Sequence, residues 1–223
     1  CMSVARNTLV QSSLTLASRV LGMVRDILLV ATIGAGPVGD AWATAQQFPN
    51  LFRRIFAEGA FASAFVPTYA RTLEAEGPEA ARAVAQEAMR VLFAATAALT
   101  ILAQIFMPWV LLLIHGGQAD DPEHYNLAVL LTRVTMPYLT FMALAALLSG
   151  VLNSSERFIL SAGVPTLLNL CLIPAALISD DPVTTAKAAS IAYFIAGVLQ
   201  AGALWWGVSR QKVHLSLLGL PRL

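Results

Sequence analysis

Long apolar segments recur along the chain and are separated by short polar stretches. Six of them are long enough to cross a hydrocarbon core about 30 Å thick, which takes about 20 helical residues. They lie near residues 8–33, 38–57, 87–114, 126–152, 158–179 and 186–208. Glycine, proline and acidic residues, which favour turns, fill the stretches between them. The pattern predicts an all-α integral membrane protein in which residues 1–208 form one unit of six transmembrane helices.

Residues 61–75 follow a different pattern. Aromatic residues and a leucine recur every four positions, at Phe61, Phe65, Tyr69 and Leu73, while charged residues occupy the other faces. This spacing predicts an amphipathic helix. The helix either lies in the inner membrane interface or packs on the cytoplasmic ends of the protein's own helices, and Pro67 weakens both arrangements.

Composition supports the membrane assignment. The 223 residues are 57% hydrophobic and 12% charged, whereas an ordinary soluble domain carries about 25% charged residues. These values exclude a disordered chain, and a net charge of +1 makes nucleic acid an unsuitable partner. Cys1 and Cys171 do not predict a disulfide. The first residues do not resemble a cleavable signal, and residues 209–223 are expected to be a cytoplasmic linker at which a longer protein is cut.

Charge along the chain predicts its orientation. With a cytoplasmic N-terminus, ten basic residues fall on the inner side: Arg6, Arg53, Arg54, Arg71, Arg82, Arg90, Arg157, Arg210, Lys212 and Arg222. The outer loops hold Asp120, Asp121, Glu123, Asp180 and Asp181, with Lys187 as their one basic residue. Because cytoplasmic loops are enriched in Lys and Arg, this distribution places the N-terminus inside. Trp42 and Trp109 then fall near the outer interface, where an aromatic belt is expected.

Charged residues also occur inside the predicted spans. Arg19, Arg25 and Asp26 share one helical face with Gly22. Each charge costs about 2.5–3.5 kcal/mol near the bilayer centre unless it faces protein or water. We therefore expect this face to line a cavity. Arg25 and Asp26 could instead form a charge pair near a membrane edge.

The second span carries Asp40, Arg53 and Arg54 and is expected to be broken by Pro49, with the freed backbone groups lining a cavity or finding protein partners. Arg53 and Arg54 could alternatively be plain cytoplasmic anchors.

Arginines prefer planar anions such as carboxylate and phosphate. The predicted cargo is therefore a lipid phosphate or diphosphate. No catalytic His or carboxylate motif and no phosphate-binding glycine loop is found in the sequence, so we expect neither an enzyme nor a metal or cofactor site.

Two stretches carry a family resemblance. Residues 18–26 (SRVLGMVRD), together with residues 40–43, 48–61 and 64–67, resemble the first- and second-helix motifs of the MurJ (MviN) family. The resemblance implies a lipid II flippase of the MOP exporter superfamily, with two six-helix lobes around a central cavity and two further helices. Such a protein moves the lipid-linked peptidoglycan precursor from the cytoplasmic to the periplasmic leaflet of the bacterial inner membrane by alternating access.

The resemblance also implies roles for individual residues and partners. The substrate-binding positions are Arg19, Arg25, Arg53 and Asp40, and Asp26, Arg54 and Glu58 belong to the same motifs. The implied partners are lipid II (an undecaprenyl-diphosphate-linked disaccharide peptide), membrane lipids and a C-terminal lobe. Six helices make one lobe, so this chain alone is not expected to flip lipid.

Two other functions fit the same sequence. One is an exporter of another polyprenyl-diphosphate oligosaccharide, which the arginines would serve equally well. The other is a non-transporting membrane scaffold for cell-wall synthesis, in which Arg19 would be dispensable. A membrane transferase would need a positioned base or metal-binding carboxylates, and Asp26 and Asp40 are too few and too far apart in sequence for that.

Overall fold

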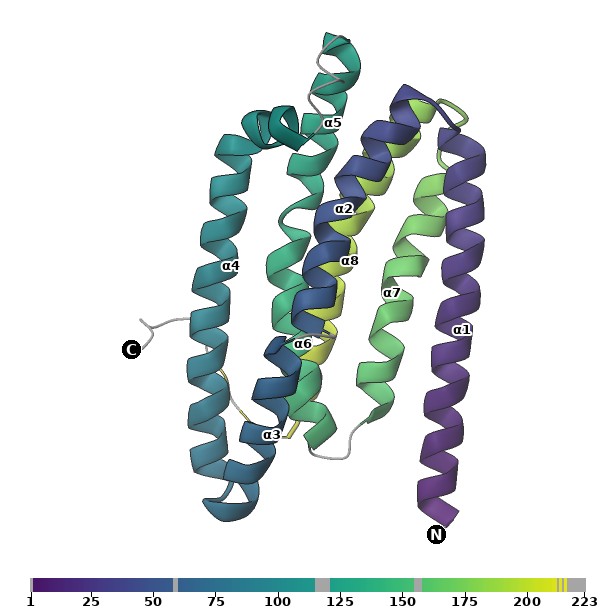
Figure 1. The fold of residues 1–223 in the computed structure, drawn as a ribbon. Coiled ribbons are helices and arrows are strands. Elements are labelled where there is room, and N and C mark those ends of the chain that lie inside the picture. The colour runs from purple at the N-terminus through teal and green to yellow at the C-terminus, as the bar shows by residue number, and fades with distance from the viewer. Residues whose placement is uncertain are drawn as a thin grey trace.

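The computed structural model describes residues 2–57, 60–114, 121–154, 158–211, 213 and 215. In this part of the chain the backbone forms helices joined by turns and short loops, with no strand. The helices are α1 (Met2–Ile33), α2 (Pro37–Ala57), α3 (Ala60–Ala75), α4 (Pro78–Ile114), α5 (Pro122–Thr135), α6 (Tyr138–Ser154), α7 (Phe158–Ala176) and α8 (Pro182–Ser209). They run roughly along one direction as an elongated bundle (Figure 1). The predicted all-α fold is confirmed.

Some predictions concern residues outside this description. They are Cys1, Glu58, Asp120, Arg157, Lys212 and Arg222, and the side chains of Arg6 and Arg53. Most of the predicted linker at residues 209–223 also lies outside it.

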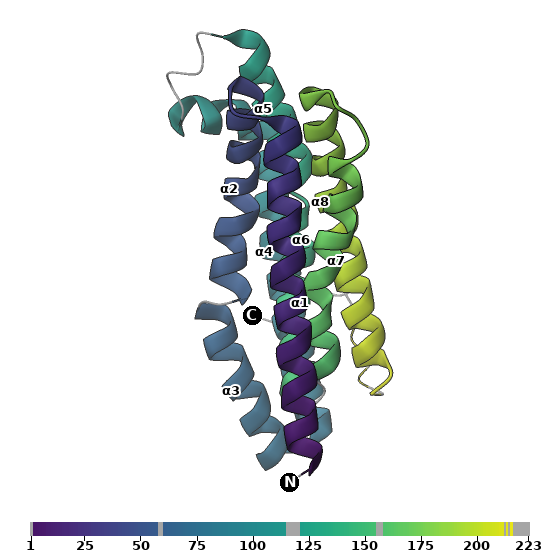
Figure 2. The ribbon, with the colours of Figure 1, turned by 90° about the vertical axis from the view of Figure 1, so that its right-hand side faces the viewer.

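Helices occupy all six segments that the hydrophobic pattern selects. Four of the described helical stretches are long and apolar enough to cross a membrane, namely α4, α5 continuing into α6, α7 and α8. Helices α1 and α2 have 32 and 21 residues but carry the charged residues discussed above. Both lie alongside the other long helices (Figures 1 and 2). That α1 and α2 also cross the membrane stays a prediction.

Helix α4 begins nine residues before the predicted span, at Pro78. The added turns are held by packing, because Ala81 and Ala85 are fully buried against a core that includes Phe65 and Leu148. The predicted span began where the continuous apolar residues begin. The helix itself starts earlier, because a helix that also carries polar residues is stable as long as one of its faces is buried.

Helix α3 covers residues 60–75 and uses its aromatic face to pack on the protein. Phe65 and Tyr69 are 6% and 2% exposed and join residues of α4 and α6 in one core. The rings of Phe61 and Phe65 are stacked with centroids 5.5 Å apart. This is the second arrangement that the sequence allows, a helix packed on the protein's own ends. Contact of α3 with the membrane surface stays a prediction.

Trp42 does not belong to an aromatic belt. It is 6% exposed and its ring centroid lies 5.9 Å from that of Tyr193 on α8. The predicted belt position was wrong because the position of a residue along a span does not say which way its side chain faces. The Trp42 side chain faces the core. Trp109, at 63% exposed, has the outward orientation that a belt residue needs.

Pro49 does not break α2, which is helical from residue 37 to residue 57. A proline at position 49 leaves the carbonyl of Ala45 without its helical N–H donor. The hydroxyl of Thr135 on α5 donates to this carbonyl at 3.1 Å. The same replacement occurs at Pro137, where the side-chain amide of Gln104 donates to the carbonyl of Arg133 at 2.7 Å. Neighbouring helices thus satisfy backbone groups that proline frees, as a membrane interior requires.

Acidic residues begin two helices at the end of the bundle opposite α3. Asp121 accepts hydrogen bonds from the backbone N–H groups of Glu123 and His124. Its pKa is lowered, chiefly by the hydrogen bond from the His124 side chain. Asp181 caps α8, and the Thr184 hydroxyl, followed by the Thr184 backbone N–H, holds the pKa of Asp181 below its ordinary value. Both carboxylates follow the usual preference for acidic N-caps.

Candidate functional site

A cavity of about 1080 Å³ lies between α1, α2, α6, α7 and α8. Its lining on α1 extends from Ser18 to Ile33, which is about 22 Å of helix at 1.5 Å per residue. That length is most of the roughly 30 Å thickness of a hydrocarbon core. The cavity therefore extends along much of the bundle, with both polar and apolar side chains in its wall.

Most of the charged residues singled out from the sequence line this cavity. They are Arg19, Arg25, Asp26, Asp40 and Arg54. Arg53 lies in α2, but its side chain is outside the described part of the structure, and so is Glu58. Since α1 and α2 run in opposite directions from their shared turn, Arg19 and Arg54 lie towards the same end of the cavity, the end nearer the N-terminus (Figure 1). Asp40 lies near the turn, towards the other end.

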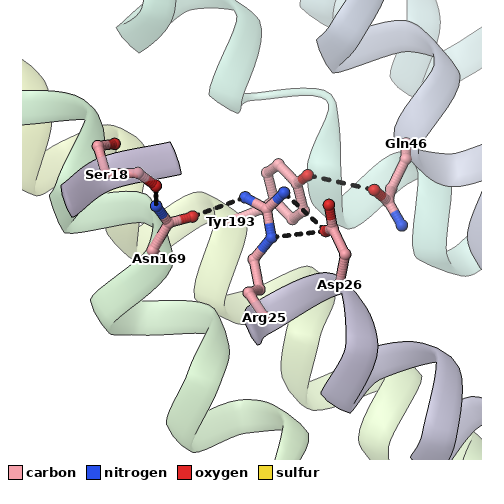
Figure 3. Close-up of polar contacts among 6 residues, drawn as sticks. All are labelled: Ser18, Arg25, Asp26, Gln46, Asn169 and Tyr193. Carbon is pink, nitrogen blue, oxygen red and sulfur yellow. Dashed lines mark hydrogen bonds and ion pairs between the residues drawn. The ribbon is translucent and has the colours of Figure 1, made fainter. Parts of the chain in front are cut away.

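The Arg25 side chain is held on both sides. Its Nε and Nη2 donate to Oδ1 of Asp26 at 2.9 and 2.7 Å, and its Nη1 donates to Oδ1 of Asn169 at 2.9 Å. The amide nitrogen of Asn169 donates in turn to the backbone carbonyl of Ser18 at 2.8 Å. Figure 3 shows this chain of contacts from α7 to α1. The predicted pair of Arg25 with Asp26 therefore exists, and it lies in the cavity wall, where Asp26 offsets the charge of Arg25.

Arg19 and Arg54 are not held by hydrogen bonds in the way that Arg25 is. Both are exposed at the cavity, and within the described part of the chain neither guanidinium makes a hydrogen bond or ion pair. Their donors are open to a ligand. Arg133 does not line the cavity, and its buried Nε has no hydrogen-bond partner among the described residues.

Further polar side chains in the wall join the helices to one another. Tyr193 on α8 donates to the side-chain oxygen of Gln46 on α2 at 3.4 Å (Figure 3). Gln200, which is 4% exposed, accepts from Tyr138 at 3.1 Å and donates to the carbonyl of Val164 at 3.2 Å. These contacts fix α2, α6 and α7 against α8 around the cavity.

Reasoning from the sequence did not select Asn169, Tyr193 or Gln200 as site residues. The available signal was a single polar residue inside an otherwise apolar span, as at Asn169 and Gln200. Such a residue is expensive in lipid and is therefore expected to face protein or a cavity. Which partner it faces depends on helix packing, and sequence spacing within one helix does not carry that information.

Comparison of the sequence with known proteins identifies relatives in one family. The family model described as lipid II flippase MurJ matches residues 29–219. A probable lipid II flippase MurJ of Rhizobium tropici is 40% identical over 97% of this chain and 42% of its own length. The corresponding protein of Rhizobium meliloti (strain 1021) is 37% identical over 96% of the chain and 41% of its own length. The lipid II flippase MurJ of Burkholderia cenocepacia is 38% identical over 89% of the chain and 39% of its own length.

The chain thus spans about two fifths of the length of these relatives. Its apolar helices and its similarity to these relatives together show that it is a multi-pass membrane protein. The matched region includes α2 to α8, the helices that carry most of the cavity wall and the packing around it. This chain belongs to the MurJ family.

Proposed function

We propose that the chain forms the N-terminal lobe of a lipid II flippase in the bacterial inner membrane, with its N-terminus in the cytoplasm. The flippase moves the lipid-linked peptidoglycan precursor from the cytoplasmic to the periplasmic leaflet by alternating access. The observation that carries this proposal is a cavity of about 1080 Å³ inside a bundle of apolar helices, lined by Arg19 and Arg54, which have no partner among the described residues. Its volume lies slightly above the usual range for ligand pockets, about 300–1,000 Å³.

The chemistry of the cavity fits a diphosphate head group. A charged head group cannot enter hydrocarbon without a large free-energy cost. Guanidinium groups form paired, charge-assisted hydrogen bonds with phosphate oxygens. Among the described residues nothing pairs with the donors of Arg19 and Arg54, and Arg53, Asp40 and Glu58 belong to the same proposed binding region through the family motifs. Flipping changes no covalent bond, so the proposed function requires no catalytic group.

The remaining wall of the cavity is proposed to come from a C-terminal lobe. The chain matches only two fifths of the length of its relatives. Helix α1 also exposes a stripe of large apolar residues, namely Leu16, Val20, Met23, Ile27 and Val30. One lobe leaves the polar face of the cavity open on one side. We therefore expect this chain alone, reconstituted in liposomes with lipid II, to show no translocation.

The decisive experiment measures translocation of fluorescent lipid II by the protein at the length that its gene encodes. Arg19→Lys keeps the charge but loses the paired donors, so it should lower the rate about ten- to a hundredfold, the equivalent of one charge-assisted hydrogen bond. Arg71→Lys is the matched control, because Arg71 is exposed on α3 outside the cavity lining. Both variants should insert normally.

Other outcomes select the alternatives. A wild-type rate for Arg19→Lys would refute the transport role of the cavity and favour a scaffold for cell-wall synthesis. Equal or faster translocation of a polyprenyl-diphosphate oligosaccharide without the peptide would assign the protein to export of that class of lipid instead.

A further inference from the structure

A second, smaller cavity of about 370 Å³ adjoins the large one near the N-terminal half of α1. The two are neighbours, because they share the lining residues Ser18, Arg19, Ser149, Asn153, Ser161 and Pro165. The smaller one is lined by hydroxyl and amide groups from α1, α6 and α7, with Arg19 as its charged residue. Its volume lies within the range for small-ligand pockets, about 300–1,000 Å³.

The polar groups of this smaller cavity retain hydrogen-bonding capacity. Ser161 donates to the side-chain oxygen of Asn153 at 2.5 Å, which orients the amide and leaves the two N–H donors of Asn153 for another partner. Ser149 is half-buried, and within the described residues its hydroxyl makes no hydrogen bond. A wall of neutral donors and acceptors suits a ligand that carries many hydroxyl and amide groups. An acyl chain would leave these groups unpaired at a cost of about 1–3 kcal/mol each.

Arg25 and Arg19 differ in how many of their hydrogen-bond donors are already used. Three of the five N–H donors of Arg25 are already used by Asp26 and Asn169, and Asp26 offsets its charge. Arg19 has no hydrogen-bond partner among the described residues and lines both cavities. An anion is therefore best bound at Arg19, and whatever is covalently attached to that anion can enter the smaller cavity.

We propose that the smaller cavity binds the first sugar of a glycosyl diphosphate, whose phosphates are held at Arg19. The sugar's hydroxyl and N-acyl groups pair with Ser149 and Asn153. The subsite selects lipids that carry a sugar over the same lipid diphosphate without one. This assignment rests on the proposed flippase function and names the part of the cavity that recognises the sugar.

Binding measurements on two probes test this subsite. The probes are lipid II and undecaprenyl diphosphate, which share the lipid and the diphosphate and differ in the sugar and peptide. The protein is used at its gene-encoded length in detergent micelles. Ser149→Ala removes one unpaired hydroxyl. Ser154→Ala is its control on the same helix, because the Ser154 hydroxyl donates to the carbonyl of Gly150 at 2.9 Å and does not line the cavity.

Ser149→Ala should weaken lipid II binding about three- to tenfold, as expected for one hydrogen bond, and leave undecaprenyl diphosphate binding unchanged. Ser149→Leu, which fills the cavity, should weaken lipid II binding further with the same selectivity. Arg19→Ala should weaken both probes. If Ser149→Leu does not fold, as judged by its thermal unfolding, Ser149→Ala decides alone.

Two results would overturn the subsite while leaving the flippase function in place. One is unchanged lipid II affinity in Ser149→Ala, and the other is an equal loss of affinity for both probes. If the unsubstituted protein binds neither probe, the proposed function itself fails, and the subsite fails with it.

Discussion

Removing the hydroxyl of Thr135 tests whether a side chain of α5 replaces the backbone donor that Pro49 denies to α2. The hydroxyl donates to the carbonyl of Ala45 at 3.1 Å, and both residues are fully buried. It also lies 3.0 Å from the carbonyl of Thr132, but that carbonyl already accepts the backbone N–H of Met136 at 2.9 Å. The carbonyl of Ala45 is therefore the group that depends on Thr135.

Thr135→Val replaces the hydroxyl by a methyl group of similar size, so it leaves little empty volume. The main loss is one hydrogen bond, and the carbonyl of Ala45 stays buried and unpaired. We expect the free energy of unfolding to fall by about 1–3 kcal/mol. In a Pro49→Ala background, residue 49 regains an N–H that can donate to the carbonyl of Ala45, four residues earlier. Thr135→Val should then cost less, and the coupling should be about 1–2 kcal/mol.

A double-mutant cycle measures this coupling from denaturant unfolding in detergent micelles, with the protein at its gene-encoded length. Any packing loss that Pro49→Ala causes alone cancels in the cycle. Thr132→Val is the control, because the Thr132 hydroxyl donates to the carbonyl of Ala128 at 2.7 Å within its own helix and has no link to Pro49. Additive effects of Thr135→Val and Pro49→Ala, within about 0.3–0.5 kcal/mol, would refute the replacement.

Three further variants probe other contacts. Gly197→Ala should lower the free energy of unfolding by about 1–3 kcal/mol, since a Cβ there would lie 2.9 Å from the Tyr138 ring. Gly202→Ala is the control and should be neutral or stabilising, because open space surrounds its Cβ. Equal effects of the two substitutions in thermal unfolding would contradict the packing. Asn169→Leu removes the hydrogen bonds to Arg25 and Ser18 and should cost about 2–4 kcal/mol in denaturant unfolding, so a loss below about 1 kcal/mol would show these bonds to be unimportant. Because the pKa of Asp181 is lowered in the folded protein, its ionised cap stabilises α8 above about pH 4 and is lost as the pH falls further. Asp181→Asn should therefore flatten the acid side of a plot of melting temperature against pH, with Asp180→Asn as control, and an unchanged slope would contradict this.

The positions of the helices could be predicted from the sequence because lipid imposes a simple rule on length and polarity. The polar face of α1 could be predicted too, since Arg19, Arg25 and Asp26 line the cavity as their spacing indicated. Both inferences depend on residues within one helix. Their physical basis is local, so a single sequence is enough to apply it.

Contacts between helices could not be obtained in this way. Asn169 and Ser18 are 151 residues apart, and Thr135 and Ala45 are 90 apart. Trp42 shows the same limit, since the sequence did not reveal that its side chain is buried in the core. Such pairings depend on which helix faces which, and this in turn depends on the shapes of all the packed surfaces at once.

The order of charges along the cavity bears on how a flippase could both bind and release an anion. A carrier must hold its cargo loosely enough to let it go. Arg19 and Arg54, both without internal partners among the described residues, lie towards the proposed cytoplasmic end. An anion that moves from there towards the other end next meets Arg25, whose charge Asp26 offsets at 2.7 Å, and then Asp40. Under the proposed function, the attraction exerted by the described charges is therefore greatest at the proposed cytoplasmic end and declines towards the other end, an order that would favour capture at the first and release at the second.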